Sequence, residues 1–244
     1  MTDTWNPWHG CVHWSEGCAH CYLYRRDEEF GRDASQVKRT ADFSLPVKRH
    51  RDGTFRIAPG SSIFTCLTSD FFIDKADIWR DEAWNMMRLR RDVNFSIITK
   101  RILRMERCLP GDWGDGWDNV SIGATMENQR CADERMPVFL DLPIKHRFIV
   151  CEPMLGPIDI RAALDPEKVE AVIAGGESGP GARVLDYDWV LDLRRQCGET
   201  GVGFRFKQTG AAFIKDGRRY EIKRALQLSQ ARRANIDLPN RKGG

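Results

Sequence analysis

The feature that most constrains the fold is a repeated alternation of short apolar runs with helical patterns. Six runs are short, continuous and apolar, as strands covered on both faces of a sheet should be: 62–67, 94–99, 119–124, 147–151, 171–174 and 203–206. Helical patterns lie between them at 77–91, 101–107, 128–141, 155–164 and 187–199. This alternation predicts a parallel sheet with right-handed crossovers. We expect an α/β fold, a partial or closed parallel β/α barrel of about six units.

At 244 residues, 41% of them hydrophobic, the chain suits one domain of barrel size or at most two small ones. No apolar run reaches membrane-spanning length, and the polar start Met1–Thr4 does not look like a signal peptide. We expect a cytoplasmic protein with no membrane partner. Eight cysteines in such a protein argue against disulfides and for metal or redox use.

Positive charge gathers at the C-terminal end. Residues 215–244 contain nine Lys/Arg and three Asp/Glu, a net charge of +6, whereas the whole chain carries +3. Basic tails often contact phosphates, although a solvated helix with a frayed end has the same pattern. We therefore divide the chain into two parts. Residues 1–214 form a barrel with an N-terminal loop that contains Cys11, Cys18 and Cys21 (the cysteine loop), and residues 215–244 form a basic tail.

Three cysteines near the N-terminus indicate the chemistry. Cys11, Cys18 and Cys21 have the spacing C-x6-C-x2-C, and Gly10 and Gly17 precede two of them, where the backbone must turn tightly or approach closely. A [4Fe–4S] cluster normally takes four cysteines, so three leave one iron open. An open coordination position usually marks a reactive site. This pattern favours a cluster enzyme with radical chemistry.

Zinc is the main alternative metal. The three thiolates with one of His9, His13 or His20 would make a closed Cys₃His site. The protein would then be a zinc-binding, nucleic-acid-associated module without enzymatic activity. A third interpretation is a cluster protein that uses its open iron for electron transfer or ligand sensing. Spacing alone leaves all three open.

Active sites of β/α barrels lie where the strands end, and polar residues follow the predicted strands there. Ser69 and Asp70 follow the first strand, Lys100 the second, Glu127 the third and Glu152 the fourth. Lys100 and the adjacent Arg101 suit a carboxylate or phosphate, and the others suit polar ligand groups. Asp70 and Glu127 have a structural alternative as helix caps, and Lys100 as a solvated lysine.

The fifth strand end is rich in glycine. Its residues Gly175, Gly176, Glu177 and Ser178 open a run that continues to Arg183. Backbone N–H groups in such a run can converge on an anion, and Glu177 can accept from an ammonium or ribose hydroxyl group. The alternative is a tight strand-to-helix turn. The density of glycines at a predicted catalytic edge favours ligand binding.

Cys151 and Glu152 are candidate catalytic residues at the end of the fourth strand. A thiol there could donate a hydrogen atom to a radical, and Glu152 could act as acid or base. The alternative for Cys151 is a small buried hydrophobic residue. Three tryptophans, Trp5, Trp8 and Trp14, surround the cysteine loop and would shield it or stack on a base.

Together these motifs resemble a phage-associated family of uncharacterised proteins, over roughly residues 5–210. The shared segments are Asn6-Pro7 with the three cysteines, Ser69-Asp70, Thr99-Lys100-Arg101, Glu127-Asn128-Gln129, Cys151 through Ile158 and Gly175 through Gly179. That family is similar to radical S-adenosylmethionine (SAM) enzymes, whose usual spacing is C-x3-C-x2-C. Their Gly-Gly-Glu motif comes earlier than Gly175-Gly176-Glu177, so Ser69 and Asp70 occupy the SAM-contacting position better.

The resemblance implies a [4Fe–4S] cluster whose open iron binds SAM. An external electron donor would drive SAM cleavage to a 5′-deoxyadenosyl radical that abstracts hydrogen from the substrate. The phage association implies a nucleic-acid substrate in the host cytoplasm, DNA or a modified nucleotide. The candidate reaction is an isomerisation in DNA hypermodification, the rearrangement of a glycyl-substituted thymine.

Overall fold

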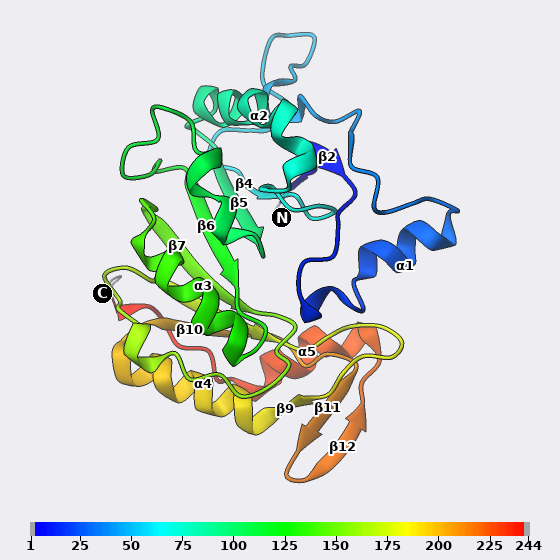
Figure 1. Ribbon diagram of the computed structural model, residues 1–244, viewed down its shortest axis with the longest axis vertical. Coiled ribbons are helices and arrows are strands. Elements are labelled where there is room, and N and C mark those ends of the chain that lie inside the picture. The colour runs from blue at the N-terminus through cyan, green and yellow to red at the C-terminus, as the bar shows by residue number, and fades with distance from the viewer. Residues whose placement is uncertain (1–2, 242–244) are drawn as a thin grey trace. The chain divides into compact units, whose positions relative to one another are not determined.

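The computed structural model describes residues 3–241 and is a mixed α/β fold (Figure 1). Its main sheet is a parallel half-barrel of seven strands that follow one another in chain order. These strands are β1 (Asp3–Trp5), β4 (Ser62–Thr65), β5 (Asn94–Thr99), β6 (Val120–Thr125), β7 (His146–Cys151), β8 (Ala171–Gly175) and β10 (Gly203–Gln208). The predicted α/β class and partial β/α barrel are confirmed at this level.

The remaining elements are five α-helices, two small sheets and six 3₁₀ turns within residues 3–241. The helices are α1 (Tyr22–Glu29), α2 (Asp77–Leu89), α3 (Gln129–Asp141), α4 (Tyr187–Thr200) and α5 (Arg224–Ala234). The small sheets join β2 (Trp8–His9) to β3 (Lys38–Arg39), and β9 (Leu185–Asp186) and β12 (Arg218–Glu221) to β11 (Ala212–Lys215). The 3₁₀ turns are η1 (Glu16–Cys18), η2 (Leu45–Val47), η3 (Asp74–Ala76), η4 (Ile102–Arg104), η5 (Glu106–Cys108) and η6 (Arg161–Ala163). None of the helices in the described part of the chain is both long and apolar enough to span a bilayer.

The chain forms two compact units. Unit 1 contains the chain up to Trp14, Leu23–Gly123 and Leu142–His146, and unit 2 contains Ser15–Tyr22, Ala124–Asp141 and the chain from Arg147 onward. In unit 1 the Trp84 ring on α2 packs on Phe71 and Trp113, with ring centroids 4.7 and 5.2 Å apart. Such aromatic contacts bury large apolar areas, so they anchor α2 to its unit.

Unit 2 includes residues 215–241 of the predicted basic tail, and this part has regular structure. Residues 242–244 of the tail lie outside the described residues. Helices α4 and α5 pack against β10, and β11 and β12 form an antiparallel hairpin, orange in Figure 1. A further bridge pairs Phe204 on β10 with Leu238. Residues from 215 to 241 are therefore a hairpin strand, a helix and a returning segment attached to β10.

All six predicted strands are present, with ends that differ by at most two residues. Two of the helical predictions are wrong. Over 155–164 there is only the turn η6, because Gln129 and Gln196 side chains accept from the backbone N–H groups of Asp159 (2.7 Å) and Ile160 (2.9 Å). Over 101–107 the chain forms the successive 3₁₀ turns η4 and η5 and then becomes extended at Leu109, before a proline.

Gly176 tests how closely unit 2 is packed. A Cβ there would lie 2.4 Å from the carbonyl oxygen of Thr209, whereas a Cβ on Gly156 would have no atom within 4 Å. We expect Gly176→Ala to lower the free energy of unfolding by about 1–3 kcal/mol through overpacking. Urea denaturation should show this loss, with Gly156→Ala as the control near wild-type stability. Equal stability of the two variants would contradict the packing.

Candidate functional site

The backbone around Cys11 is fixed within unit 1. The N–H groups of Gly10 and Cys11 donate to the carbonyl oxygens of Thr68 (3.0 Å) and Ala34 (2.8 Å). Gly10 has a φ of 102°, and a Cβ there would lie 2.4 Å from the carbonyl oxygen of Gln36. Glycine is therefore required before this cysteine by both its conformation and the close approach of another backbone segment.

Asp70 joins the carboxyl ends of two strands. Its buried carboxylate accepts from the N–H groups of Phe72 (2.9 Å) and Lys100 (3.0 Å) and from the Thr99 hydroxyl (2.8 Å). Thr99 ends β5, and Asp70 lies shortly after β4. The structure thus shows this predicted SAM contact as a structural acceptor, and its contact with a cofactor stays a prediction.

The neighbouring Ser69 also contacts the cysteine loop. Its hydroxyl donates to the carbonyl oxygen of Gly10 at 2.5 Å, and the adjacent Thr68 N–H donates to Asn6 Oδ1 at 3.0 Å. The Ser69-Asp70 and Asn6-Pro7 segments are therefore in contact through hydrogen bonds that hold the chain before Cys11.

The three tryptophans divide into two kinds. Trp5 and Trp8 are fully buried, and their indole N–H groups donate to the carbonyl oxygens of Phe43 (2.9 Å) and Asp70 (3.2 Å). Trp14 is 42% exposed. Trp5 and Trp8 therefore belong to the core, whereas Trp14 has a ring that a ligand could contact.

In unit 2, the chain before Cys18 is fixed by a buried ion pair. The Glu127 and Arg135 side chains are 0% and 1% exposed, with Arg135 Nη1 2.6 Å from Glu127 Oε2. The Ser15 hydroxyl donates to the other oxygen of this carboxylate. A Cβ on Gly17 would lie 2.6 Å from the Glu127 side chain. The ion pair therefore sets the position of η1 and of Cys18 at its end.

A second carboxylate, Glu177, holds the segment between Cys18 and Cys21. Glu177 Oε2 lies 3.0 Å from His20 Nδ1 and also accepts from the backbone N–H of Arg183 at 2.9 Å, while Arg183 Nη2 donates to Oε1 at 2.6 Å. Burial acts to raise the pKa of this carboxyl, but the hydrogen bonds and charge of Arg183 hold it below its ordinary value. Glu177 is therefore an ionised anchor for His20.

The donor set suits a metal or cluster chemically. Cys18 is buried, Cys11 and Cys21 are half-buried, and none of the eight cysteines, all within the described residues, is in a disulfide. Cys11 belongs to unit 1, and the other two belong to unit 2. Among residues 3–241 no group of three His, Cys, Asp or Glu side chains is arranged to hold a metal ion. The three thiols fit the donor requirement of a cluster with one open iron, and their role as ligands stays a prediction.

Two of the histidines in the alternative zinc site pair with carboxylates. His9 Nε2 lies 2.8 Å from Asp27 Oδ2, and His20 pairs with Glu177. The His13 ring packs against Tyr24, with ring centroids 4.1 Å apart. Only His20 therefore combines a position between two of the cysteines with a carboxylate behind its ring.

Glu152 is bound to the end of β10. Its oxygens accept from Gln208 Nε2 at 2.5 Å and Lys207 Nζ at 2.6 Å. The adjacent Cys151 is fully buried, and burial, together with the neighbouring Cys197 and Glu127, raises the pKa of its thiol. This environment keeps Cys151 as the neutral thiol, and its catalytic role stays a prediction.

The glycine-rich segment has backbone partners of its own. The N–H of Gly176 donates to the carbonyl oxygen of Gln208 at 3.0 Å, and the Ser178 hydroxyl accepts from Arg224 Nη1 at 3.0 Å. Gly179 and Gly181 have φ values of 101° and 68°. Gly175 and Gly176 thus join β8 to β10, and the later glycines form the turn that brings Arg183 back to Glu177.

Sequence reasoning missed Ser15, Glu16 and Arg135. Glu16 lies between Asn128 Nδ2 (2.9 Å) and Arg130 Nη2 (3.1 Å), and its carbonyl oxygen accepts from Arg183 Nη1. A buried arginine on the helix after Glu127 could have been suspected from the charge in an apolar helical pattern. The contacts of Ser15 and Glu16 link positions more than 100 residues apart and leave no local signal.

A family described as "Protein of unknown function (DUF5131)" matches residues 1–235, so the chain belongs to this family. Neither curated proteins nor solved structures give a match to the chain.

The buried ion pair can be tested by Glu127→Gln. This change leaves the Arg135 charge buried without its counter-ion, so we expect a loss of about 3–5 kcal/mol in the free energy of unfolding. Glu16→Gln is the matched control, because the Glu16–Arg130 pair is exposed and should contribute less than about 1 kcal/mol. Urea denaturation measures both, and similar losses would contradict the assigned role of Glu127.

The anchor at Glu177 predicts a pH dependence. Because its folded-state pKa is depressed, its contribution to stability is present above the ordinary carboxyl pKa of about 4.3 and is lost as the pH falls through the folded value. We expect Glu177→Gln to be less stable than wild type at pH 7. That difference should shrink in urea titrations at pH 4 and pH 3. A difference that stays constant over this range would contradict the assignment.

Proposed function

We propose that the protein is a radical SAM-type enzyme whose [4Fe–4S] cluster is held by Cys11, Cys18 and Cys21. The observation that carries the proposal is a cysteine loop whose two parts are held by residues that follow strands of the main sheet. Thr68 and Ser69 hold the chain before Cys11, and Glu127 and Glu177 hold the chain around Cys18. When bound, the cluster and SAM supply a reactive carbon radical. The parallel half-barrel is compatible with this class.

The chain's own residues position the ligating loop. Glu127 orients Ser15, Glu177 orients His20, and the Gly10 carbonyl accepts from Ser69, so thiol positions depend on strand-end residues. Hydrogen bonds of this kind orient the backbone next to each thiol, and such supporting contacts help to hold the ligands of a bound group. Glu152, held by Lys207 and Gln208, is the proposed acid or base, and Cys151 is the proposed hydrogen-atom donor.

The proposed substrate is a base in DNA or a modified nucleotide, with rearrangement of a glycyl-substituted thymine as the candidate reaction. Eight basic residues of the C-terminal segment are exposed in the described chain: Lys215, Arg218, Arg219, Lys223, Arg224, Arg232, Arg233 and Arg241. Exposed Lys and Arg side chains attract nucleic-acid phosphates without regard to sequence. The hairpin and α5 therefore offer a surface for the DNA backbone.

A zinc-binding, non-enzymatic protein is the second candidate, and the His20–Glu177 pair favours it. Metal-bound histidines commonly donate their other ring N–H to a carboxylate, and His20 Nδ1 lies 3.0 Å from Glu177. Such a site would use His20 Nε2 with the three thiolates. It would tie up every coordination position and leave none for SAM.

Anaerobic reconstitution with iron and sulfide tests the first proposal. We expect about four iron atoms per chain and, after reduction with SAM, release of 5′-deoxyadenosine detected by chromatography. Cys11→Ala, Cys18→Ala and Cys21→Ala should each lose cluster and product. Cys197→Ala, buried on α4 outside the loop, is the matched control and should retain both.

The same preparations separate the two candidates. Stoichiometric zinc, no cluster, and a 10–100-fold loss of zinc affinity in Glu177→Gln would contradict the enzyme proposal and support the zinc site. If 5′-deoxyadenosine forms, incubation with DNA that contains glycyl-substituted thymine tests the substrate. Because the two isomers have the same mass, the nucleosides are separated by chromatography and identified by their fragmentation in tandem mass spectrometry. An unchanged nucleoside profile would contradict the proposed isomerisation.

A further inference from the structure

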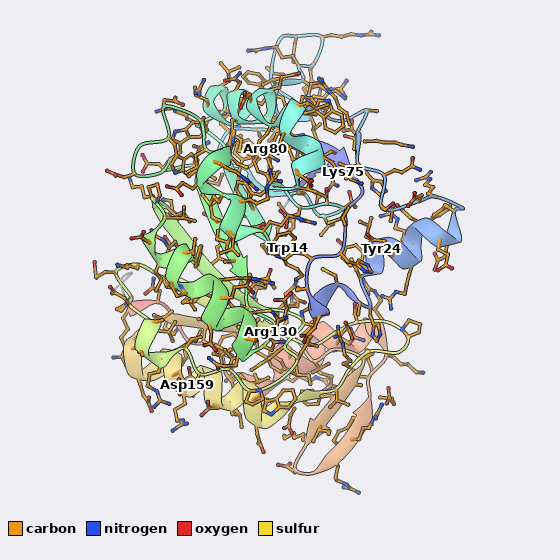
Figure 2. The ribbon with its side chains drawn as sticks, in the orientation of Figure 1. Trp14, Tyr24, Lys75, Arg80, Arg130 and Asp159 are labelled. Atoms are coloured by element: carbon orange, nitrogen blue, oxygen red, sulfur yellow. The ribbon has the colours of Figure 1, made fainter. Side chains whose placement is uncertain are left out.

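Unit 1 contains a cavity of about 680 Å³. It is not lined by the three loop cysteines or by the strand-end carboxylates and glycines described above. Four arginines, Arg80, Arg101, Arg104 and Arg107, line it together with Trp14, and we call it the arginine pocket. Figure 2 labels Trp14 and Arg80 among these side chains. We propose that the arginine pocket binds the phosphate of a nucleotide whose base stacks on Trp14.

One arginine of the pocket is structural. Arg80 Nε donates to the carbonyl oxygen of Phe71 at 3.0 Å, Nη2 donates to Ile73 at 2.5 Å, and Nη1 pairs with Asp77. Each of its nitrogens therefore has an acceptor within unit 1. Arg80 therefore fixes the start of α2, and it is an example of a buried arginine whose donors are all satisfied by the protein.

Arg101 and Arg104 are buried to a similar degree but are not satisfied. They are 4% and 8% exposed, and within residues 3–241 no hydrogen-bond acceptor reaches Arg101 Nε or Arg104 Nε and Nη1. Arg104 Nη1 has Asp74 at 4.0 Å, beyond hydrogen-bond distance. Buried donors without acceptors are costly, so an entering anion would restore hydrogen bonds that the protein itself does not provide.

Three of the four arginines in the pocket are more buried than its carboxylates. Its three carboxylates belong to Asp74, Asp77 and Asp81, and the Asp74 and Asp77 side chains are 69% and 50% exposed. Asp77 is already bound to Arg80 and Arg104, the latter at 2.9 Å. Arg107 is exposed at the same cavity. A phosphate, with several acceptor oxygens, matches the forked donors of Arg101 and Arg104 better than a single-oxygen ligand does.

Trp14 gives the pocket its second recognition element. The Arg101 guanidinium carbon lies 4.5 Å from the centre of the Trp14 ring, and Arg101 Nη2 donates to the carbonyl oxygen of Val12 at 2.7 Å. Val12 directly follows Cys11. The arginine that lines the pocket is therefore bound to the cysteine loop itself, and an exposed indole beside buried cations is the pairing that holds a nucleotide.

The choice of a nucleotide rests on the proposed function, because a base near Cys11 would lie beside the proposed cluster. The phosphate site rests only on the unsatisfied arginines and is testable without SAM. A cavity of about 680 Å³ lies within the usual range of roughly 300–1,000 Å³ for small-molecule sites.

The test measures binding of dTMP, inorganic phosphate and a short oligothymidylate to the full-length chain, purified anaerobically, by calorimetry without SAM. The variants are Arg104→Gln, Arg107→Gln and Trp14→Leu. Arg195→Gln, which removes an exposed positive charge on α4 outside the pocket, is the charge-matched control. Thermal melting and iron content confirm that each variant is folded and retains its metal loading.

We expect dTMP to bind more tightly than inorganic phosphate. Arg104→Gln should weaken both at least about tenfold, Trp14→Leu should weaken dTMP at least about fivefold while sparing phosphate, and Arg195→Gln should bind like wild type. Arg107 is exposed, so Arg107→Gln should leave the fold intact. This change should reduce the steepness of log K against log salt concentration for oligothymidylate binding by about 0.7. Absence of dTMP and phosphate binding, or binding unchanged in both Arg104→Gln and Arg107→Gln, would overturn the proposal.

The two proposals can fail separately. If the chain binds dTMP through these arginines but loads no cluster, the result supports the phosphate site and contradicts the proposed radical enzyme. If the chain cleaves SAM but binds no phosphate or nucleotide, the result contradicts only the proposed phosphate site in the arginine pocket.

Discussion

The buried ion pair between Glu127 and Arg135 is the interaction on which the position of the chain around Cys18 depends. Removing two charges from water is costly, and the cost is offset only when the charges meet closely and their remaining hydrogen-bonding groups are occupied. Here most of these groups are occupied, because Arg135 also donates to the Thr125 carbonyl and Ser15 occupies the second carboxylate oxygen. Arg135 Nε has no acceptor within residues 3–241. The end of β6, helix α3 and the chain before Cys18 are therefore fixed by one carboxylate.

Other carboxylates that follow strands also connect separate segments of the chain by hydrogen bonds. Asp70 connects the ends of β4 and β5, Glu152 connects the segment after β7 to β10, and Glu177 connects the segment after β8 to His20. Side chains with the appearance of ligand-binding groups are thus largely occupied by protein donors. Within the described residues, the clearest unsatisfied donors at a cavity belong instead to Arg101 and Arg104. The sequence placed Arg101 at the end of the second predicted strand, but no sequence pattern singled out Arg104.

The strands were predictable because each is an apolar run that ends in polar residues, and a sheet covered on both faces requires this pattern. Helical predictions failed where side chains compete for the backbone, as Gln129 and Gln196 do over the segment that ends in η6. The very short strand β1 could not be assigned because three residues carry too little pattern. The basic tail was visible as charge, but its attachment to β10 depends on distant pairings such as Phe204 with Leu238.

The sequence by itself determined the α/β class, the order of the main strands, the cysteine spacing and the polar residues at the strand ends, because these follow from local periodicity and residue chemistry. Only the tertiary structure decided which of those polar groups are occupied. Glu127 meets Ser15 across 112 residues and Glu177 meets His20 across 157. Whether a carboxylate anchors a loop, or an arginine keeps donors for a ligand, depends on which distant groups folding brings to it and on the cost of burying any that remain unpaired.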